Sequence, residues 1–380
     1  MGTIATFCRR APLPPLALVS AVSCALAGCA GVPTPYAGPQ RATFLGANAQ
    51  FVFLAGPRER DLQLDAMVRA GVTFVRDDAP WELVEPSPPI AGHHQYSWSV
   101  LDGVVEALAQ RRLRWLPIAD YSTTWASISP GYTFAPPARI DDYAAFAAAL
   151  AARYGPDGAF WREHPSLAAV PVTQIELWNE PNATTFWQPS TNPAAYARLF
   201  AVASVAIRAA NPAVTAVVGG LAPAGDTAFV RAMIDALPVV RGLIDAVGLH
   251  PYATDARGVQ SIVAAMRHAL NADGLSGASI FVTEVGWPVR GASAANVVSD
   301  ATRAMDLALA LRLAALSGCG VSAFAPYTWT TPQRDPGNSE DWYGLYGPDA
   351  RPSRTAIALT DAATRLNLAS RPPEGTTGPC

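Results

Sequence analysis

The stretch QIELWNEPN, residues 174–182, indicates how this chain folds. Its first five residues have the apolar and aromatic character of a β-strand. The strand has to end near Pro181, because proline has no amide hydrogen for a sheet and restricts the residue before it. Glu180 is therefore predicted at the carboxyl end of a strand, with Asn179 beside it, which is where α/β barrels build their active sites. Taken alone, the stretch also fits an ordinary strand exit with a solvated glutamate.

Segments of strand and helix character alternate over most of the chain. The strands, expected to be largely apolar along their length, are typical of a parallel sheet covered by helices. They are predicted at 43–47, 72–76, 113–119, 173–179, 215–219, 246–250, 279–284 and 321–325, and the helices at 59–70, 100–108, 142–154, 192–210, 226–237, 259–270, 296–315 and 354–366. Eight such units predict the α/β class and a (β/α)8 TIM barrel. The alternative, a doubly wound open sheet, lacks its Gly-x-Gly-x-x-Gly turn after the first strand.

The first 28 residues are predicted to be a signal peptide. Arg9 and Arg10 give it a positive start, and the apolar run at 16–27 is too short to span a bilayer. The motif LAGC at 26–29 resembles the lipobox of bacterial lipoproteins, in which the cysteine becomes the lipidated first residue of the mature chain. Acyl chains on Cys29 would hold the protein at a membrane without spanning it. Cleavage nearby, giving a secreted protein, is the alternative.

These observations divide the chain into four parts and place its folded domain outside the cytoplasm. The parts are the signal peptide (1–28), the lipidated Cys29 with a flexible tether (29–42), the catalytic barrel (43–370) and a C-terminal tail (371–380). We expect a membrane-anchored lipoprotein, periplasmic or on the cell surface. No later apolar run of about 20 residues predicts a second membrane segment.

Composition narrows the partners that the domain can have. The 380 residues carry a net charge of −3, only 15% of them are charged, and no basic stripe is visible, which argues against nucleic-acid binding. A monomer is expected.

The cysteines give one open question. Three of the five, Cys8, Cys24 and Cys29, fall in or at the end of the targeting segment, which leaves Cys319 and Cys380 for the folded domain. An exported compartment permits a disulfide, but the sequence leaves the pairing open, and Cys319 is expected to be a small buried residue. Without a cysteine cluster, a structural zinc site is not expected.

Polar and aromatic side chains recur where the predicted strands end. A series of this kind around one rim is the layout of a barrel active site. Its members are Arg76, Asp120, Tyr121, Asn179, Glu180, His250, Tyr252, Glu284, Tyr327 and Trp329. Glu180 and Glu284 end strands four and seven and are predicted to face each other across the mouth. Glycoside cleavage needs such a pair, one carboxyl to protonate the leaving oxygen and one to attack or to activate water.

A sugar site also needs an aromatic platform. Trp178, Trp287 and Trp329 would provide faces that pack against a pyranose, whereas packing inside the barrel is the alternative expected for at least one of them. The aromatic-rich stretch with Trp342 and Tyr343 hints at more distant subsites.

Five motifs in the right order give a specific resemblance. They are RDDAPWELVEP (76–86), ELWNEPN (176–182), GLHPY (248–252), FVTEVGWP (281–288) and PYTW (326–329). Together they resemble clan A glycoside hydrolases, most of all the retaining β-glycosidases of families 39 and 5, over residues 43–365.

The resemblance implies roles for three residues at the centre of the rim. Glu180 matches the general acid/base, Glu284 the nucleophile, and Asn179 the residue that hydrogen-bonds the sugar 2-hydroxyl. Hydrogen bonds and a nearby guanidinium would keep a nucleophile ionised, whereas the acid needs a less favourable site for its charge. Retention predicts carboxyl groups about 5–5.5 Å apart, against about 6.5–9.5 Å for inversion.

The resemblance also implies the substrate-binding residues. Tyr252 matches a tyrosine that donates to the nucleophile, Arg76 an arginine beside it, and His250 a subsite-lining histidine. The tryptophan under the sugar is matched by Trp329, and the set is completed by Trp287 and Tyr327.

Other charged residues are expected to be structural. Glu176 should point into the barrel below the site, paired with Arg76, because a buried charge needs a partner. Asp77, Asp78 and Glu85 are expected in capping or solvated roles, with substrate contact by one of them as the alternative. The role of Asp120 stays open. His93 and His94 are expected to be solvated, and no His-x-His ends the first strand, so neither a metal nor a cofactor is expected.

We therefore predict a retaining glycosidase that cleaves β-glycosidic bonds of an extracellular or envelope polysaccharide or oligosaccharide by double displacement. A non-catalytic polysaccharide-binding lipoprotein with the same fold and a transglycosylase with the same carboxyl pair are the alternatives. The loops at 81–98, 121–138 and 330–346 would select the sugar.

Overall fold

The computed structural model describes residues 44–53, 55–292, 296–370 and 380. The predicted signal peptide, Cys29 with its tether, and all of the predicted tail except its last residue lie outside the described residues.

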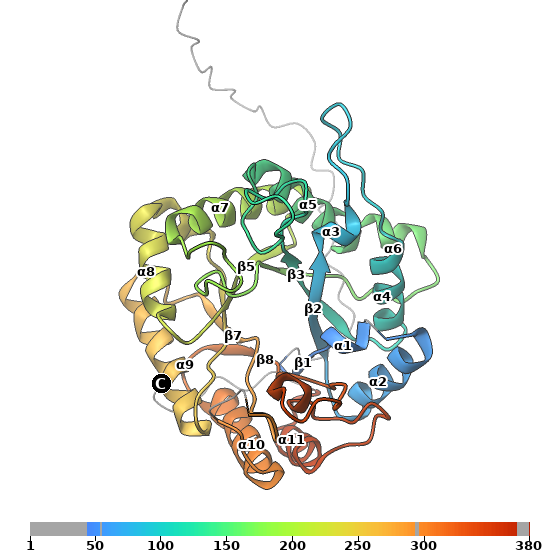
Figure 1. Ribbon diagram of the computed structural model, residues 1–380, viewed down its shortest axis with the longest axis vertical. Coiled ribbons are helices and arrows are strands. Elements are labelled where there is room, and N and C mark those ends of the chain that lie inside the picture. Colours follow the sequence, from blue (N-terminus) through green and yellow to red (C-terminus); the bar gives the residue numbers. More distant parts are fainter. Residues whose placement is uncertain (1–43, 54, 293–295, 371–379) are drawn as a thin grey trace, which may run out of the picture. The chain divides into compact units, whose positions relative to one another are not determined.

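Eight parallel strands form a ring in the order of the sequence (Figure 1). They are β1 Gly46–Asn48, β2 Phe74–Pro80, β3 Arg114–Asp120, β4 Gln174–Leu177, β5 Thr215–Leu221, β6 Ala246–Leu249, β7 Ser279–Val282 and β8 Val321–Phe324. The amide of Phe324 donates to the carbonyl of Phe44 at 2.7 Å, which brings the first and last strands together. The predicted (β/α)8 barrel is confirmed.

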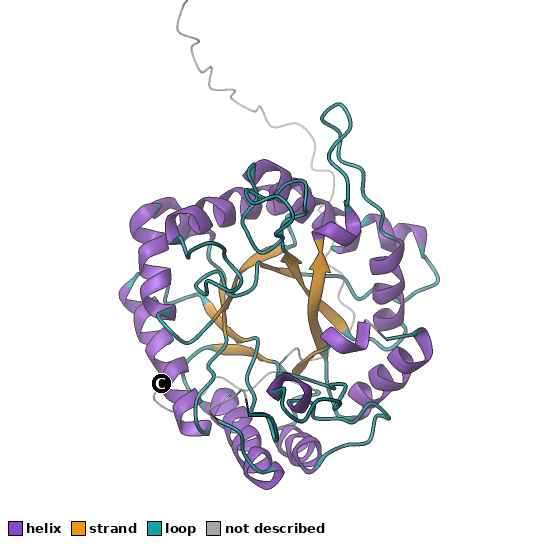
Figure 2. Ribbon diagram, in the orientation of Figure 1, coloured by secondary structure: helices purple, strands orange, loops and turns teal. Residues whose placement is uncertain are grey.

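The helices surround this ring (Figure 2). They are α1 Gln50–Phe53, α2 Pro57–Arg69, α3 Trp81–Val84, α4 Ser99–Ala109, α5 Ile140–Tyr154, α6 Ala159–Glu163, α7 Pro193–Ala210, α8 Asp226–Ala236, α9 Ala256–Ala272, α10 Asp300–Leu316 and α11 Arg354–Arg365, with short 3-10 helices η1 Pro238–Leu243 and η2 Ser339–Trp342. Local chemistry sets where a helix begins. In α7 the Asn192 side chain accepts from the Ala195 amide, and Pro193 occupies the first turn.

The fourth strand is shorter than predicted. It was expected to run to Asn179, but β4 ends at Leu177 because Trp178 and Glu180 adopt left-handed backbone angles, with φ of 70° and 45°. A non-glycine residue in that region cannot continue a strand. The chain therefore turns sharply after Leu177, where Asn179 and Glu180 follow the end of the strand.

The barrel interior is layered from apolar to charged along its axis. Phe74 and Leu116 pack with Ala323 and Ala325 in a cluster of their own. Arg76 lies two residues after Phe74 on β2, so its side chain points to the same side of the sheet. It donates to both carboxylate oxygens of Glu176, at 3.0 and 2.7 Å. The predicted structural pairing of Glu176 with Arg76 is confirmed.

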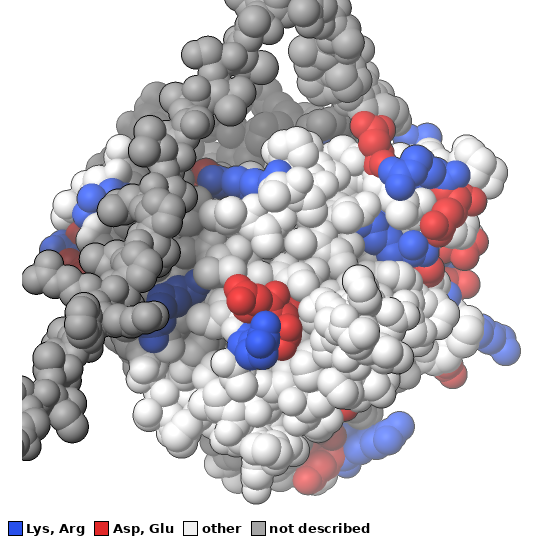
Figure 3. All heavy atoms as spheres, turned by 90° about the horizontal axis from the view of Figure 1, so that it is seen from above, with Lys and Arg blue, Asp and Glu red and all other residues white. Residues whose placement is uncertain are grey.

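Charge on the outer surface is dispersed. On the face seen in Figure 3, arginines and acidic residues lie in small groups of mixed sign, separated by uncharged side chains. Among the described residues, no helix has both the length and the apolar character that crossing a membrane requires.

A disulfide joins Cys319 to Cys380, whose Cα atoms are 4.6 Å apart. Cys319 is buried, as expected. It pairs with Cys380, a pairing that the sequence alone leaves open. It ties the last residue of the chain to the turn before β8.

Breaking this disulfide should lower the free energy of unfolding. The bond spans 61 residues, and cross-links of this kind contribute about 2–4 kcal/mol by restricting the unfolded chain. We expect a loss of that order in Cys380→Ser, measured by urea denaturation, and no additional loss when a reductant is added to the variant. Equal stability of the oxidised and reduced native protein would contradict this.

Candidate active site

A cavity of about 410 Å³ opens at the carboxyl ends of the strands. Its lining combines many polar groups with a few aromatic rings: Asn48, Gln50, Arg76, Asp77, Asp78, Ile118, Tyr121, Asn179, Glu180, Phe186, Tyr252, Glu284, Asn296, Tyr327, Glu340 and Tyr343. Seven of the ten rim residues predicted from the sequence are among them, namely Arg76, Tyr121, Asn179, Glu180, Tyr252, Glu284 and Tyr327.

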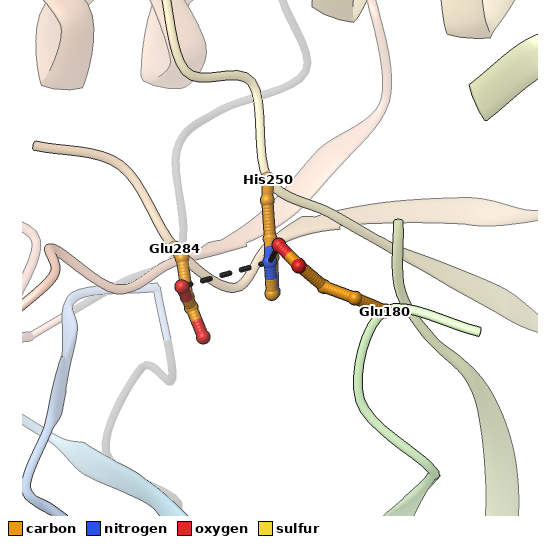
Figure 4. Close-up of side chains that lie close together, drawn as sticks. All are labelled: Glu180, His250 and Glu284. Carbon is orange, nitrogen blue, oxygen red and sulfur yellow. Dashed lines mark hydrogen bonds and ion pairs between the residues drawn. The ribbon is translucent and has the colours of Figure 1, made fainter. Parts of the chain in front are cut away.

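Two glutamates approach each other across this cavity. Glu180 follows β4 and Glu284 follows β7, and Figure 4 shows His250 between them. Nδ1 of His250 lies 2.9 Å from Oε1 of Glu180 and 3.6 Å from Oε2 of Glu284. One carboxylate oxygen of each glutamate and a ring nitrogen of the histidine all lie within 4.8 Å of one another. The two carboxyl groups can therefore reach the same small group.

The carboxyl group of Glu284 is held in its ionised form. Oε1 accepts a 2.7 Å hydrogen bond from Arg76, and Oε2 accepts a 2.8 Å bond from the Tyr252 hydroxyl. Burial alone would raise the pKa of Glu284, but His250, Arg76 and the Tyr252 hydrogen bond outweigh it, so the pKa lies below the usual value of a glutamate. An anion in this position is available to attack an electrophilic carbon.

Arg76 uses every donor that it has. Besides its bonds to Glu176 and Glu284, it donates to Oδ1 of Asn48 and to Oδ1 of Asn179, each at 2.8 Å. A guanidinium has five N–H groups, and these partners account for all of them. Burial lowers the pKa of Arg76, but Glu176 and Glu284 raise it well above its usual value. Since Asn179 accepts from Arg76 through its oxygen, its amide nitrogen is the donor in its hydrogen bond with Tyr121, and the amide has a second N–H for a ligand.

A close contact of backbones positions Glu180. The Glu180 amide donates to the carbonyl of Gly220 at 2.9 Å, which holds the left-handed turn after β4. A Cβ on Gly220 would lie 2.0 Å from Nε2 of His250, so only glycine lets this part of β5 pass the histidine. Left-handed non-glycine residues cost about 1–3 kcal/mol and collect at functional sites.

The predicted tryptophan platform is not in the cavity. Trp178, Trp287 and Trp329 are buried, and none of them lines it. Each indole N–H has an internal partner: the carbonyl of Phe186, the carbonyl of Ala253 and the side chain of Gln63, respectively. Trp329 also stacks on Tyr346 with ring centres 4.0 Å apart. All three therefore pack within the fold, where packing had been expected for at least one.

Other aromatic residues take that place. The cavity is lined by Tyr121, Phe186, Tyr327 and Tyr343. The sequence hinted at Tyr343 through its aromatic-rich loop, but Phe186 carries no motif signal. His250 does not line the cavity and is fully buried behind the two glutamates.

The expectations for the remaining carboxylates need correction. Asp77 and Glu85, expected to be capping or solvated, are buried and therefore not solvated, and each accepts from a backbone amide, that of Asp78 and of Gln95 respectively. Glu85 accepts from the Trp81 indole at 2.9 Å and lies 2.8 Å from Nδ1 of His94, so this histidine is not simply solvated. Asp120, whose role the sequence leaves open, is also buried.

No protein-family model matches the sequence, and no curated relative matches it. Solved structures do share its architecture. A family 39 glycoside hydrolase from Bacteroides cellulosilyticus WH2 is 22% identical with a TM-score of 0.60, over 87% of this chain and 64% of that one. A GH39 β-xylosidase from Caulobacter crescentus is 18% identical with a TM-score of 0.61, over 85% and 71%. GH5_18 from Streptomyces cattleya is 16% identical with a TM-score of 0.63, over 88% and 83%.

At these identities the likeness shows a shared fold. The chain spans less than two thirds of the length of the Bacteroides enzyme.

Removing the Tyr252 hydroxyl should raise the pKa of Glu284, because the carboxylate then loses one of the hydrogen bonds that favour its charge. A 13C NMR titration of the Glu284 carboxyl in Tyr252→Phe would measure the change. Tyr327→Phe is the matched control, since that hydroxyl bonds to Glu340 instead. An unchanged pKa in Tyr252→Phe, or an equal rise in the control, would contradict the assignment.

Proposed function

We propose that this protein is a retaining glycosidase that hydrolyses β-glycosidic bonds by double displacement, with Glu180 as general acid/base and Glu284 as nucleophile. The observation that carries the proposal is that the two carboxyl groups, which follow β4 and β7, bring oxygens within 4.8 Å of each other in one cavity. Oxygens this close leave little room for the water that the inverting arrangement, with a separation of about 6.5–9.5 Å, has to admit, which supports the retaining arrangement of about 5–5.5 Å.

In the first step Glu284 attacks the anomeric carbon as the glycosidic bond breaks. The proton of Glu180 goes to the leaving oxygen, and a glycosyl ester forms on Glu284. The nucleophile needs no activation by a base, because Arg76 and Tyr252 already stabilise its charged form. The amide nitrogen of Asn179 has two N–H groups, so it can bond to the sugar 2-hydroxyl as well as to Tyr121.

In the second step water replaces the leaving group. Glu180, now a carboxylate, takes one proton from the water. At the same time the water oxygen attacks the anomeric carbon and the ester bond to Glu284 breaks. The product forms with its original configuration, Glu284 returns as a carboxylate and Glu180 is protonated again. The 2.9 Å contact with His250 orients the Glu180 carboxyl through both steps.

The proposed substrate class is supported by solved structures with the same fold. Enzymes with this fold include one described as a β-xylosidase and one as an exo-β-1,4-mannosidase, which supports β-linked sugars. We propose a polysaccharide or oligosaccharide outside the cytoplasm, bound by a monomer without a cofactor.

The location is part of the proposal. The lipobox-like LAGC at 26–29 supports an exported lipoprotein anchored through Cys29. The Cys319–Cys380 disulfide supports an oxidising compartment, because cytosolic thiols are kept reduced.

Azide should distinguish the roles of the two glutamates. In Glu180→Ala, azide can enter the space of the acid/base and attack the glycosyl ester, giving a β-glycosyl azide. In Glu284→Ala it attacks from the nucleophile's side and gives the α-anomer. Without azide, loss of the acid should lower kcat about 10²–10⁴-fold for substrates with poor leaving groups.

A 2-deoxy-2-fluoro β-glycoside should add its sugar mass to the peptide that contains Glu284, with Glu340→Gln as the control variant that keeps the label. Polysaccharide binding without labelling or turnover would favour a binding protein. A dominance of coupled products at high acceptor concentration would favour a transglycosylase.

Lipidation is testable by mass. Expression of the full chain in a bacterium should yield a mature protein whose first residue is diacylated Cys29, partitioning into detergent. Cys29→Ser should remain unprocessed at this position. A soluble mature chain cleaved elsewhere would show plain secretion instead.

A further inference from the structure

Three aromatic side chains form one corner of the cavity, where the segments that follow β3 and β4 meet. Tyr121 and Phe186 line the cavity, and their rings are nearly parallel, with centres 6.1 Å apart. Phe134 packs edge-to-face against both, at 4.6 Å from the ring centre of Tyr121 and 5.7 Å from that of Phe186. We call Tyr121, Phe134 and Phe186 the aromatic corner. The two reaction steps make no direct use of its rings.

The aromatic corner extends from the cavity to solvent. Phe134 is 36% exposed, although phenylalanine is among the residues that proteins most often bury. Tyr121 and Phe186 are half-buried. Because Phe134 contacts the two rings that line the cavity, the three give a continuous apolar surface from the inside of the cavity to its outside. Exposed apolar surface that adjoins a polar cleft is typical of a binding site.

A buried tryptophan and a bond between the two segments hold the aromatic corner in place. The indole N–H of Trp178 donates to the carbonyl of Phe186 at 2.6 Å, and the indole ring packs edge-to-face against Tyr121 with centres 5.2 Å apart. The amide of Gln188 donates to the carbonyl of Phe134 at 3.1 Å. An aromatic surface that is fixed in advance loses little conformational entropy when a ligand binds.

The two segments that carry the aromatic corner are uncharged. Residues 121–138 and 181–192 contain no Asp, Glu, Lys, Arg or His, and their polar residues are Ser, Thr, Tyr, Trp, Asn and Gln. Such segments offer hydrogen bonds without a charge. They suit a ligand with neutral hydroxyl groups and provide no ion pair for a phosphate or a carboxylate.

A sugar ring matches both properties. The face of an aromatic ring carries partial negative charge, which attracts the C–H groups on the face of a pyranose. The hydroxyl groups around the edge of the pyranose need hydrogen-bond partners when they leave water. Since the aromatic corner is continuous with the cavity that holds Glu180 and Glu284, a sugar bound there belongs to the same chain as the bond that is cleaved.

We propose that the aromatic corner is an additional sugar subsite, which binds a unit of a neutral β-linked oligosaccharide beyond the sugar that Glu284 attacks. The cavity of about 410 Å³ lies near the lower end of the range of about 300–1,000 Å³ typical of small-ligand sites, so a longer chain has to continue along its rim. The subsite rests on the proposed function, which makes the cavity a sugar site.

Binding to a silenced enzyme tests the subsite without turnover. Calorimetry with Glu284→Gln would measure the tetrasaccharides of β-1,4-linked xylose, mannose and glucose and the three matching monosaccharides. We expect at least one tetrasaccharide to bind about 10-fold or more tighter than its monosaccharide, because further sugar units bury apolar surface on the aromatic corner.

This ratio of affinities should depend on the aromatic corner. Adding Phe134→Ala or Phe186→Ala should lower it about 5-fold or more. Tyr132→Ala is the matched control and should leave it unchanged, because Tyr132 is an aromatic residue of the same segment that is 64% exposed and does not line the cavity. Circular dichroism would show whether each variant folds, and Phe134→Leu, which keeps an apolar side chain without an aromatic face, carries the test if the alanine variants do not.

Four outcomes would overturn the subsite: no binding of any tetrasaccharide, equal affinities for tetrasaccharide and monosaccharide, a ratio that survives the substitutions at Phe134 and Phe186, or an equal fall in Tyr132→Ala. Labelling of Glu284 by a fluoro-glycoside together with any of these would leave the proposed function intact. Tetrasaccharide binding that depends on the aromatic corner, without labelling by any fluoro-glycoside, would instead overturn the proposed function and leave a sugar-binding surface.

Discussion

The site depends on one guanidinium group held in the barrel interior. Arg76 lies between Glu176, which carries the balancing charge below it, and Glu284 and Asn179, which face the cavity. Buried ion pairs often add little net stability, but removal of one partner costs about 3–5 kcal/mol because the other charge is left unpaired. The network therefore acts mainly as a positioning device, since it fixes the Glu284 carboxylate and the Asn179 amide relative to one rigid group.

The same network explains why the two glutamates differ. Glu284 has a cation and a phenol hydroxyl on its two oxygens, whereas the contact made by Glu180 is to His250. Two carboxyl groups of the same residue type thus have different electrostatic surroundings. The left-handed turn at Glu180 adds to the asymmetry, because Glu180 lies on this turn, whereas Glu284 follows strand β7.

Much of the fold was predictable because it rests on local signals. Apolar strands alternating with helices indicated all eight units, and polar residues at strand ends indicated the rim. The failures involve contacts between distant segments. Trp329 is large, aromatic and near the rim, which suits a sugar platform as well as core packing. In the structure it is buried, and its indole N–H donates to Gln63, 266 residues away.

The acidic residues show the same limit. A carboxylate next to a strand end normally indicates solvent, and nothing near Asp120 in the sequence shows that it would be buried.

The disulfide adds a property of a different kind. Cys319 precedes β8, so the last residue of the chain is fastened at the amino-terminal end of the barrel, opposite the cavity. A support or fusion partner attached to Cys380 would leave the mouth of the cavity unobstructed.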